Sequence, residues 1–466
     1  MQTINSVYGY SALPVNNYSL AQAYQAIFQL AKQPWAMWLD SCDSQHVDNQ
    51  YDIFVWQPLV KITTDNDTTQ IADQQGVLSK HQVDPLSIVE QQLSKLLPKE
   101  DIAPSTLPFS GGAVGYFSYD LGRAFEHLPT IAEKDLPVPD MAVGVYDQAL
   151  IIDKFNKQTY LFCCDSKRQR LVEQLTQLAK SSEDADCFLL TTPWQSNMSQ
   201  AQYRDKFDSI QQYLRSGDCY QINLTQRFSA QYQGDEFSAY LKLRAQNNAP
   251  FSAYLNLDEI KVLSISPERF IKVDNRQVQT KPIKGTRPRG NTTKQDQANK
   301  QALINATKDK AENLMIVDLL RNDLSRACRP GSVKVPKLFD IESFPAVHHL
   351  VSTIEGELAD NMSAIDLLRG AFPGGSITGA PKIRAMEIIE ELEPHRRNIY
   401  CGSIGYLSAC GNMDTSITIR TLTCVNNQIV CSAGGGIVAD SICDEEYQET
   451  FDKVNKILPI LGEIEQ

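Results

Sequence analysis

Residues 281–290 constrain the fold of this chain most strongly, because prolines and glycines alternate with charged side chains there. Pro282, Gly285, Pro288 and Gly290 do not sit comfortably inside a helix or a central strand, so an irregular backbone is expected. The same stretch holds four cations: Lys281, Lys284, Arg287 and Arg289. A solvated basic loop is the ordinary interpretation of such a run. The alternative is a basic site that binds an anionic ligand.

The overall charge argues against a polyanionic partner for this basic stretch. The chain has 466 residues, with 56 acidic and 44 basic side chains and a net charge of −12. That balance disfavours nucleic acid or an anionic membrane as the main partner. Eleven cysteines without a Cys-x-x-Cys pair favour reduced thiols, and hence a cytoplasmic enzyme.

Hydrophobic periodicity predicts a mixture of helices and strands along the chain. The predicted helices are residues 20–32, 199–214, 296–327 and 383–392, and an apolar stripe from Tyr447 to Leu461 indicates a helix at the carboxyl end. The predicted strands are residues 35–39, 220–228, 261–265, 399–408 and 414–423. On the strand at 220–228, Gln221, Asn223, Thr225 and Arg227 share one polar face.

Two pairs of carboxylates are candidates for a metal site. Asp309 and Glu312 stand three residues apart on one predicted helix, and so do Glu446 and Glu449 on another, with Lys453 following. Such pairs are often solvated surface charges. Facing a polar pocket instead, they would suit Mg²⁺, which takes one or two carboxylates together with substrate oxygens and water.

Several other residues could bind a carboxylate ligand. Arg420 offers two parallel donors to a carboxylate. The glycine-rich turn at 372–382 lacks the lysine of a phosphate-binding loop, but its amides at a helix start could hold a carboxylate. Three successive glycines, Gly434, Gly435 and Gly436, would let the backbone approach a ligand closely.

Two short motifs carry a resemblance to a known family. Pro-Ile-Lys-Gly-Thr at 282–286 and Ser-Pro-Glu-Arg-Phe at 266–270 resemble the active-site signature of the chorismate-utilising enzymes. The resemblance covers nearly the whole chain and is most specific from about 200 to 452. It implies an α+β fold of two large antiparallel sheets packed as a sandwich with helices outside. We expect an amino-terminal half at 1–190, interleaved with a catalytic region at 191–466, and a polar connection near 180–186.

The resemblance also implies roles for individual residues. Lys284 would be the nucleophile at ring C2, and Glu268 the general acid toward the leaving 4-hydroxyl. Glu268 would then need a raised pKa, which burial supplies, and Lys284 a lowered one, to which Lys281, Arg287 and Mg²⁺ would contribute. The implied substrate contacts are Gln221, Thr286, His349, Tyr400, Arg420, Gly434, Gly435, Gly436 and Lys453. The implied magnesium ligands are Glu312 and Glu449, with Glu446 and Asp309 beside them.

The residue types at two positions indicate which reaction to expect. Members that add water to chorismate carry a lysine base where this chain has Gln221, and an amide cannot take a proton from water. Lys284 is typical of members that make 4-amino-4-deoxychorismate from chorismate and ammonia, on the route to 4-aminobenzoate and folate. Anthranilate synthase component I, which usually has alanine at this position, is the nearest alternative. A ligand-binding chain without chemistry and a nucleic-acid binder are the alternatives from other classes.

Two further ligands follow from the family. Relatives hold tryptophan in their amino-terminal half, and Ser41 and Tyr51 are the expected contacts here. Ammonia would come from a separate glutamine amidotransferase subunit, because the turn around Cys219 lacks the second glycine of a glutaminase nucleophile turn.

Overall fold

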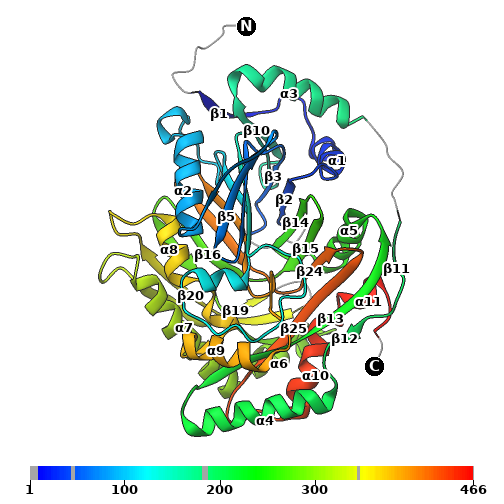
Figure 1. The fold of residues 1–466 in the computed structure, drawn as a ribbon, viewed down its shortest axis with the longest axis vertical. Coiled ribbons are helices and arrows are strands. Elements are labelled where there is room, and N and C mark those ends of the chain that lie inside the picture. The colour runs from blue at the N-terminus through cyan, green and yellow to red at the C-terminus, as the bar shows by residue number, and fades with distance from the viewer. Residues whose placement is uncertain (1–8, 43–47, 181–186, 344–346, 465–466) are drawn as a thin grey trace.

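The strands of the chain build two large antiparallel sheets (Figure 1). The computed structural model describes residues 9–42, 48–180, 187–343 and 347–464. Within these residues one sheet has 13 strands and the other has 12. The expected sandwich of two antiparallel sheets with helices outside is therefore confirmed. Residues 181–186 of the predicted polar connection lie outside the described residues.

Both sheets mix strands from the two parts of the sequence. The larger sheet runs in the order β1 (Tyr10–Pro14), β10 (Gln158–Cys164), β9 (Ala149–Asp153), β3 (Tyr51–Val55), β2 (Ala36–Asp40), β14 (Phe251–Leu257), β15 (Ile260–Ser266), β24 (Thr421–Val425), β25 (Gln428–Ile437), β13 (Gln221–Gly234) and β11 (Phe188–Leu190), and β12 (Gln195–Ser196) and β21 (Gly379–Ala380) pair with β13. The smaller sheet runs in the order β18 (Ile283–Pro288), β20 (Val347–Glu357), β17 (Gln277–Thr280), β16 (Arg269–Asp274), β23 (Met413–Ile417), β22 (Ser403–Ser408), β7 (Gly112–Phe117), β8 (Met141–Tyr146), β4 (Val60–Asp65), β5 (Thr68–Asp73) and β6 (Gly76–His81), and β19 (Lys334–Ser343) pairs with β20.

Helices cover the outer faces of the two sheets on opposite sides of the molecule (Figure 1). The helices are α1 (Leu20–Leu30), α2 (Pro85–Leu96), α3 (Asp165–Leu178), α4 (Gln200–Ser216), α5 (Glu236–Asn247), α6 (Thr293–Ile304), α7 (Thr307–Ser325), α8 (Ala364–Ala371), α9 (Lys382–Leu392), α10 (Cys443–Val454) and α11 (Leu458–Leu461), with short 3₁₀ turns at Lys99–Asp101, Tyr119–Ala124 and Gly375–Ile377. Among the helices of the described residues, none is both long and apolar enough to cross a bilayer.

Alternation along the strands divides the apolar side chains between two cores. On β14, Ala253 and Leu255 join the core between the sheets, whereas Tyr254 joins the core under α1, α3, α5 and α11. Successive side chains of a strand point to opposite faces, so a sheet that is covered on both sides buries both sets. Packing from both sides holds the strands that carry the site rigidly in place.

Two of the points at which the chain crosses from one sheet to the other are neighbours. The first crossing joins β15 to β16 through Pro267 and Glu268, and the second joins β23 to β24 through residues 418–420. The crossings bond to each other, because the Ile417 amide donates to the Glu268 carbonyl at 3.0 Å. The single strand predicted at 414–423 was therefore wrong. Arg420 lies in the break with φ of 52°, so it does not continue the strand face of Ser416.

Two predicted helices were also too long. The run at 296–327 divides into α6 and α7 at Asn305 and Ala306, and Ala306 has an extended backbone with ψ of 98°. The apolar stripe from Tyr447 to Leu461 is shared by α10 and α11, because a second short helix begins at Leu458 with Pro459 in its first turn. The stripe marked the buried side correctly, since Val454 and Leu458 are both buried.

The basic stretch at 281–290 contains a strand where an irregular backbone was expected. β18 is the edge strand of the smaller sheet, and its register against β20 shifts between Lys284 and Thr286. Gly285, between them, has φ of +77°, a conformation that favours glycine. Proline is tolerated at an edge, and a bulge redirects the neighbouring side chains.

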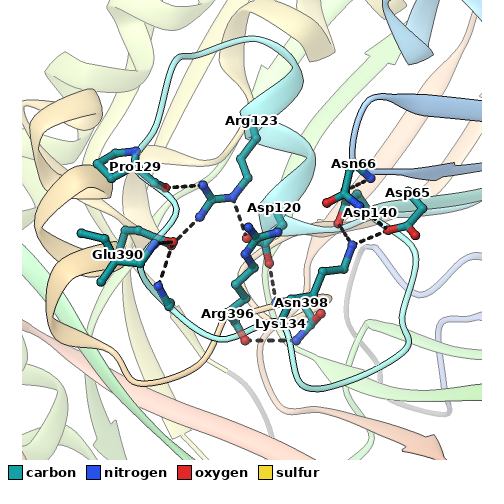
Figure 2. A network of polar contacts seen from close by, with 12 residues as sticks. Asp65, Asn66, Asp120, Arg123, Pro129, Lys134, Asp140, Glu390, Arg396 and Asn398 are labelled. Carbon is teal, nitrogen blue, oxygen red and sulfur yellow. Dashed lines mark hydrogen bonds and ion pairs between the residues drawn. The ribbon is translucent and has the colours of Figure 1, made fainter. Parts of the chain in front are cut away.

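A network of charged side chains fastens the segment after β7 to α9 (Figure 2). Arg123 bonds to Asp120 at 3.2 Å and also pairs with Glu390 on α9. Asp120 accepts a hydrogen bond from the Asn398 amide at 2.8 Å. The network therefore fixes the turn that precedes Tyr400, one of the predicted site residues.

Candidate active site

One cavity of about 560 Å³ collects most of the predicted site residues. Its lining includes Glu268, Lys284, Thr286, Asp309, Glu312, His349, Tyr400, Arg420, Gly434, Gly436, Glu446, Glu449 and Lys453. Gln221 and Gly435 lie directly behind this lining. A Cβ on Gly436 would fall 2.0 Å from the Gln221 amide nitrogen, and one on Gly435 would fall 2.8 Å from Glu446 Oε2. These glycines therefore allow the close packing of the lining.

Lys284 projects into the cavity from the bulge in β18. Its Nζ lies 3.5 Å from the Ser376 carbonyl, a long and weak contact. Burial lowers the pKa of Lys284, and Lys453 lowers this pKa too, whereas Glu312 and Glu268 raise it. The net direction favours the free amine that a nucleophile needs.

The other cations of the 281–290 stretch are ion-paired. Lys281 pairs with Glu342 at 2.5 Å, and Arg287 with Asp309 at 3.3 Å. The largest effect of another cation on the pKa of Lys284 comes from Lys453 on α10, and not from Lys281 or Arg287 as expected.

Glu268 sits in the first crossing with only 7% of its surface exposed. Burial raises the pKa of Glu268 to about 7, although Lys284, the Ser376 hydroxyl and the Ile283 amide all lower it. The Ser376 hydroxyl donates to Glu268 Oε1 at 3.2 Å. A carboxyl with this pKa is protonated about half of the time at neutral pH, as a general acid requires.

Glu268 could instead have formed a salt bridge to Arg269 or Arg287, but both arginines have other partners among the described residues. Arg269 is bound by Asp414 at 2.9 Å and by Asp48 at 2.8 Å, and Arg287 is bound by Asp309.

A polar group opposite the carboxyl offers donors to an anion. Burial lowers the pKa of Arg420, and within the described residues no ion pair or hydrogen bond to its guanidinium is found. Burial and the charge of Arg420 lower the pKa of His349 to about 4, so its ring is neutral. His349 Nδ1 is hydrogen-bonded to Thr286 Oγ1 at 2.8 Å. Tyr400 is buried beside these groups. Arg420 is therefore the side chain best prepared to bind a carboxylate.

Four carboxylates enter the cavity from α7 and α10. Burial raises the pKa of Glu312 and of Glu446, and the charge of Glu449 raises both further. Burial opposes the ionisation of Glu449, but Lys453, 2.6 Å away, lowers its pKa. Asp309 is already paired with Arg287.

The carboxylates of Glu312, Glu446 and Glu449 suit Mg²⁺, because this cation needs few protein ligands. Mutual repulsion among Glu312, Glu446 and Glu449 is what a bound cation would relieve. In the described part of the chain, no three His, Cys, Asp or Glu side chains form a complete metal cage. Mg²⁺ commonly binds through one or two carboxylates and completes its shell with substrate and water.

Sequence reasoning missed the part that Ser376 plays. The turn at 372–382 was expected to bind a carboxylate through amides at the start of a helix. Instead Ser376 and Ile377 line the cavity, while Lys382 at the start of α9 is held by Asp323 at 2.7 Å. The only signal was the position of a serine inside a glycine-rich turn.

The predicted tryptophan contacts lie in a second cavity of about 300 Å³. Ser41 and Tyr51 line it together with Phe251 and Arg269. Arg269 lies over the Phe251 ring, with 4.8 Å from its Cζ to the ring centre. The second cavity therefore combines aromatic and charged walls.

The sequence and the fold both match known proteins. Residues 35–459 match the family described as chorismate binding enzyme. An aminodeoxychorismate synthase component 1 from Klebsiella aerogenes is 56% identical over 429 residues, which cover 92% of this chain and 94% of that protein. The protein of the same name from Escherichia coli is 55% identical, over 92% of this chain and 94% of that protein. The crystal structure of anthranilate synthase component I from Streptococcus pneumoniae superposes with a TM-score of 0.78 at 31% identity, covering 89% of this chain and 93% of that one.

Proposed function

Because the chain belongs to the family of chorismate-binding enzymes, we infer that it converts chorismate and ammonia to 4-amino-4-deoxychorismate, the precursor of 4-aminobenzoate in folate synthesis. Relatives above 50% identity that carry the component 1 name support this reaction. The observation that carries it is one cavity holding Lys284, which favours the free amine, and Glu268 with a pKa of about 7.

The two residues divide the chemistry between C2 and C4 of the ring. The Lys284 amine forms a bond to C2, the ring double bond shifts, and the C4–O bond breaks. The departing hydroxyl takes the proton of Glu268 and leaves as water. Ammonia then bonds to C4, the double bond shifts back, and the C2–N bond breaks to return the Lys284 amine. Glu268 regains a proton from the added ammonia, so chorismate and ammonia give the product and water.

The remaining polar groups bind and orient chorismate, which carries two carboxylates. Arg420 binds one carboxylate, and the backbone of Gly434 and Gly436 lies close to the ring. Neutral His349 can donate or accept a hydrogen bond at the departing hydroxyl without repelling Arg420. The Gln221 amide cannot take a proton from water, so the addition of ammonia is favoured over the addition of water.

Magnesium is the cofactor that the acidic group would hold. Glu312 and Glu449 would be its ligands, with Glu446 beside them. Asp309 would contribute less, because its carboxylate is paired with Arg287. Mg²⁺ in this place supplies charge neutralisation for a substrate carboxylate and withdraws electrons from the ring.

Ammonia would come from a glutamine amidotransferase subunit. Cys219 is buried, and burial raises the pKa of its thiol to about 11, so it is a poor nucleophile. The component 1 names of the relatives agree with a second component. All eleven cysteines are free thiols, which supports a reducing, cytoplasmic setting.

Tryptophan is the ligand proposed for the second cavity. Phe251 and Tyr51 offer aromatic surface for an indole, and Asp414 and Asp48 offer carboxylates for an ammonium group. Calorimetric titration with tryptophan tests this assignment, and a Tyr51→Ala variant should weaken any binding that is found.

Product identity tests the proposed reaction. The purified chain, given chorismate, Mg²⁺ and ammonium, should release 4-amino-4-deoxychorismate. Glutamine should not replace ammonium unless an amidotransferase is added. Formation of the 2-amino isomer or anthranilate as the main product would assign the chain to the alternative reaction.

A further inference from the structure

Two amide side chains on β13 have oxygens without a donor. Gln221 and Asn223 alternate along the strand, so they point to the same face, and they are 1% and 7% exposed. Within the described residues, Gln221 Oε1 and Asn223 Oδ1 are buried and accept no hydrogen bond. Farther along this face the polar side chains are satisfied, since Thr225 donates to Glu393 at 2.7 Å and Arg227 pairs with Asp135. The missing donors are therefore confined to the end of the face at the active-site cavity.

The backbone holds Asn223 firmly in place. Its amide donates to the Thr378 carbonyl at 2.9 Å, and its carbonyl accepts from Arg397 Nη2 at 2.7 Å. Asn223 pairs with Gly436 on β25, whose missing side chain leaves room for the Gln221 amide. The backbone position from which the Asn223 amide reaches the cavity is therefore fixed.

Asn223 shares the cavity with both reacting side chains. It lines the cavity together with Lys284 and Glu268. The turn at 376–378 connects them, because Ser376 binds the Glu268 carboxyl at one end and Thr378 binds Asn223 at the other. The Asn223 amide therefore lies on the same side of the cavity as Glu268, which is the proposed acid for the hydroxyl that leaves C4.

A small molecule with several N–H donors fits these oxygens best. The carboxylates of chorismate are acceptors and cannot satisfy an amide oxygen, and its 4-hydroxyl carries a single donor for two oxygens. Lys453 is already committed to the Gly434 carbonyl at 2.6 Å and to Glu449. Ammonia carries three N–H donors and one lone pair. An amide oxygen can accept its N–H without taking a proton, so the lone pair stays available for carbon.

We propose that Asn223, with Gln221 beside it, forms the binding site for the ammonia that attacks C4. This assignment rests on the proposed function and adds a specific site for its second substrate. The carbonyl oxygens orient ammonia through its N–H groups, and the lone pair then faces the carbon that loses its hydroxyl. Asn223 thereby contributes to the second half of the reaction and leaves the first half to Lys284 and Glu268.

Asn223→Val tests this site by removing the amide from a strand position that suits a β-branched residue. Formation of the lysine adduct is measured by mass spectrometry without ammonia, and its consumption is measured after ammonium is added. We expect adduct formation and the KM for chorismate to change less than twofold, and the KM for ammonium to rise about tenfold. Gln221→Leu should act in the same direction, and it keeps the test open if Asn223→Val does not fold.

Gln226→Leu is the matched control. Gln226 lies on the opposite face of the same strand, and its amide is satisfied by Ser196 and Thr450. Its replacement should leave the KM for ammonium unchanged. Slowed adduct formation with an unchanged KM for ammonium, in the Asn223 and Gln221 variants, would overturn the ammonia site and assign the amides to chorismate. Failure of the unaltered enzyme to form an adduct would instead overturn the proposed lysine chemistry.

Discussion

The pKa of Glu268 sets a pH window for the first half of the reaction. With a pKa of about 7, half of the enzyme carries the required proton at pH 7, about nine tenths at pH 6 and about one tenth at pH 8. A carboxyl at the ordinary value of 4.5 would be protonated in only about one molecule in 300 at pH 7. Adduct formation on Lys284, followed without ammonia, should therefore fall as the pH rises through about 7.

Ser376→Ala should move this window to higher pH. The Ser376 hydroxyl donates to Glu268 Oε1 at 3.2 Å and so stabilises the ionised carboxylate. Hydrogen bonds to charged groups contribute about 1.5–3 kcal/mol, and at this length the lower end applies. Since 1.36 kcal/mol corresponds to one pH unit, the alkaline limb should shift upward by about one unit. At pH 8 the variant should retain about half of its own maximum rate, against about a tenth for the unaltered enzyme.

Thr378→Val controls for damage to the same turn. The Thr378 hydroxyl donates to the Gly374 carbonyl at 3.2 Å and does not touch Glu268. Stopped-flow or quench measurements of adduct formation from pH 5 to 9 should show an unshifted limb for this control. An unshifted limb in Ser376→Ala would refute the assignment of the limb to Glu268, and so would a limb near pH 4.5 in the unaltered enzyme.

Three further outcomes follow from the same site. Lys284→Ala should abolish the adduct, lower the rate and move the remaining amination from C4 toward C2, because ammonia then reaches C2 directly. Chromatography of the products checks this, and amination at C4 at the full rate would exclude the lysine as nucleophile. Glu312→Gln or Glu449→Gln should raise the Mg²⁺ concentration for half-maximal rate by at least about tenfold, while thermal unfolding stays close to that of the parent. The free energy of unfolding of the parent should fall as the pH rises from 5 to 8, because its buried Glu268 carboxyl must lose a proton in that window. Glu268→Gln has no such proton, so in urea unfolding it should gain up to roughly 3 kcal/mol relative to the parent.

Local motifs pointed to Glu268 and Lys284, which line the same cavity, because each motif is short and continuous. Glu268 and Lys284 each lie inside a run of five residues that can be recognised without knowing the fold, although pairing with distant strands places both side chains. The direction of both pKa changes could also be expected, since burial penalises the charged form of either group. The part of Lys453 could not be expected, because the pairing of Lys281 and Arg287 depends on where β19 and α7 place their acids.

The breaks in regular structure were hidden from periodicity. Residues 414–423 alternate like one strand, but the chain leaves the smaller sheet after Ile417 and enters the larger sheet at Thr421. Periodicity describes the faces of a segment and says nothing of which sheet it joins. The position of Arg420 therefore depends on the pairing of the whole fold, although its candidacy as a carboxylate ligand was visible in the sequence.

The two neighbouring crossings explain why Glu268 and Arg420 line one cavity. Glu268 and Arg420 each lie where the chain passes between sheets, and the crossings are hydrogen-bonded to each other. Both side chains line the cavity, and Glu268 is buried there. Burial is consequently the largest cause that raises the pKa of Glu268 and lowers those of Lys284 and His349. All three changes are toward the neutral form, so the packing of the sheets shifts the carboxyl, the amine and the imidazole in the direction that the proposed reaction needs.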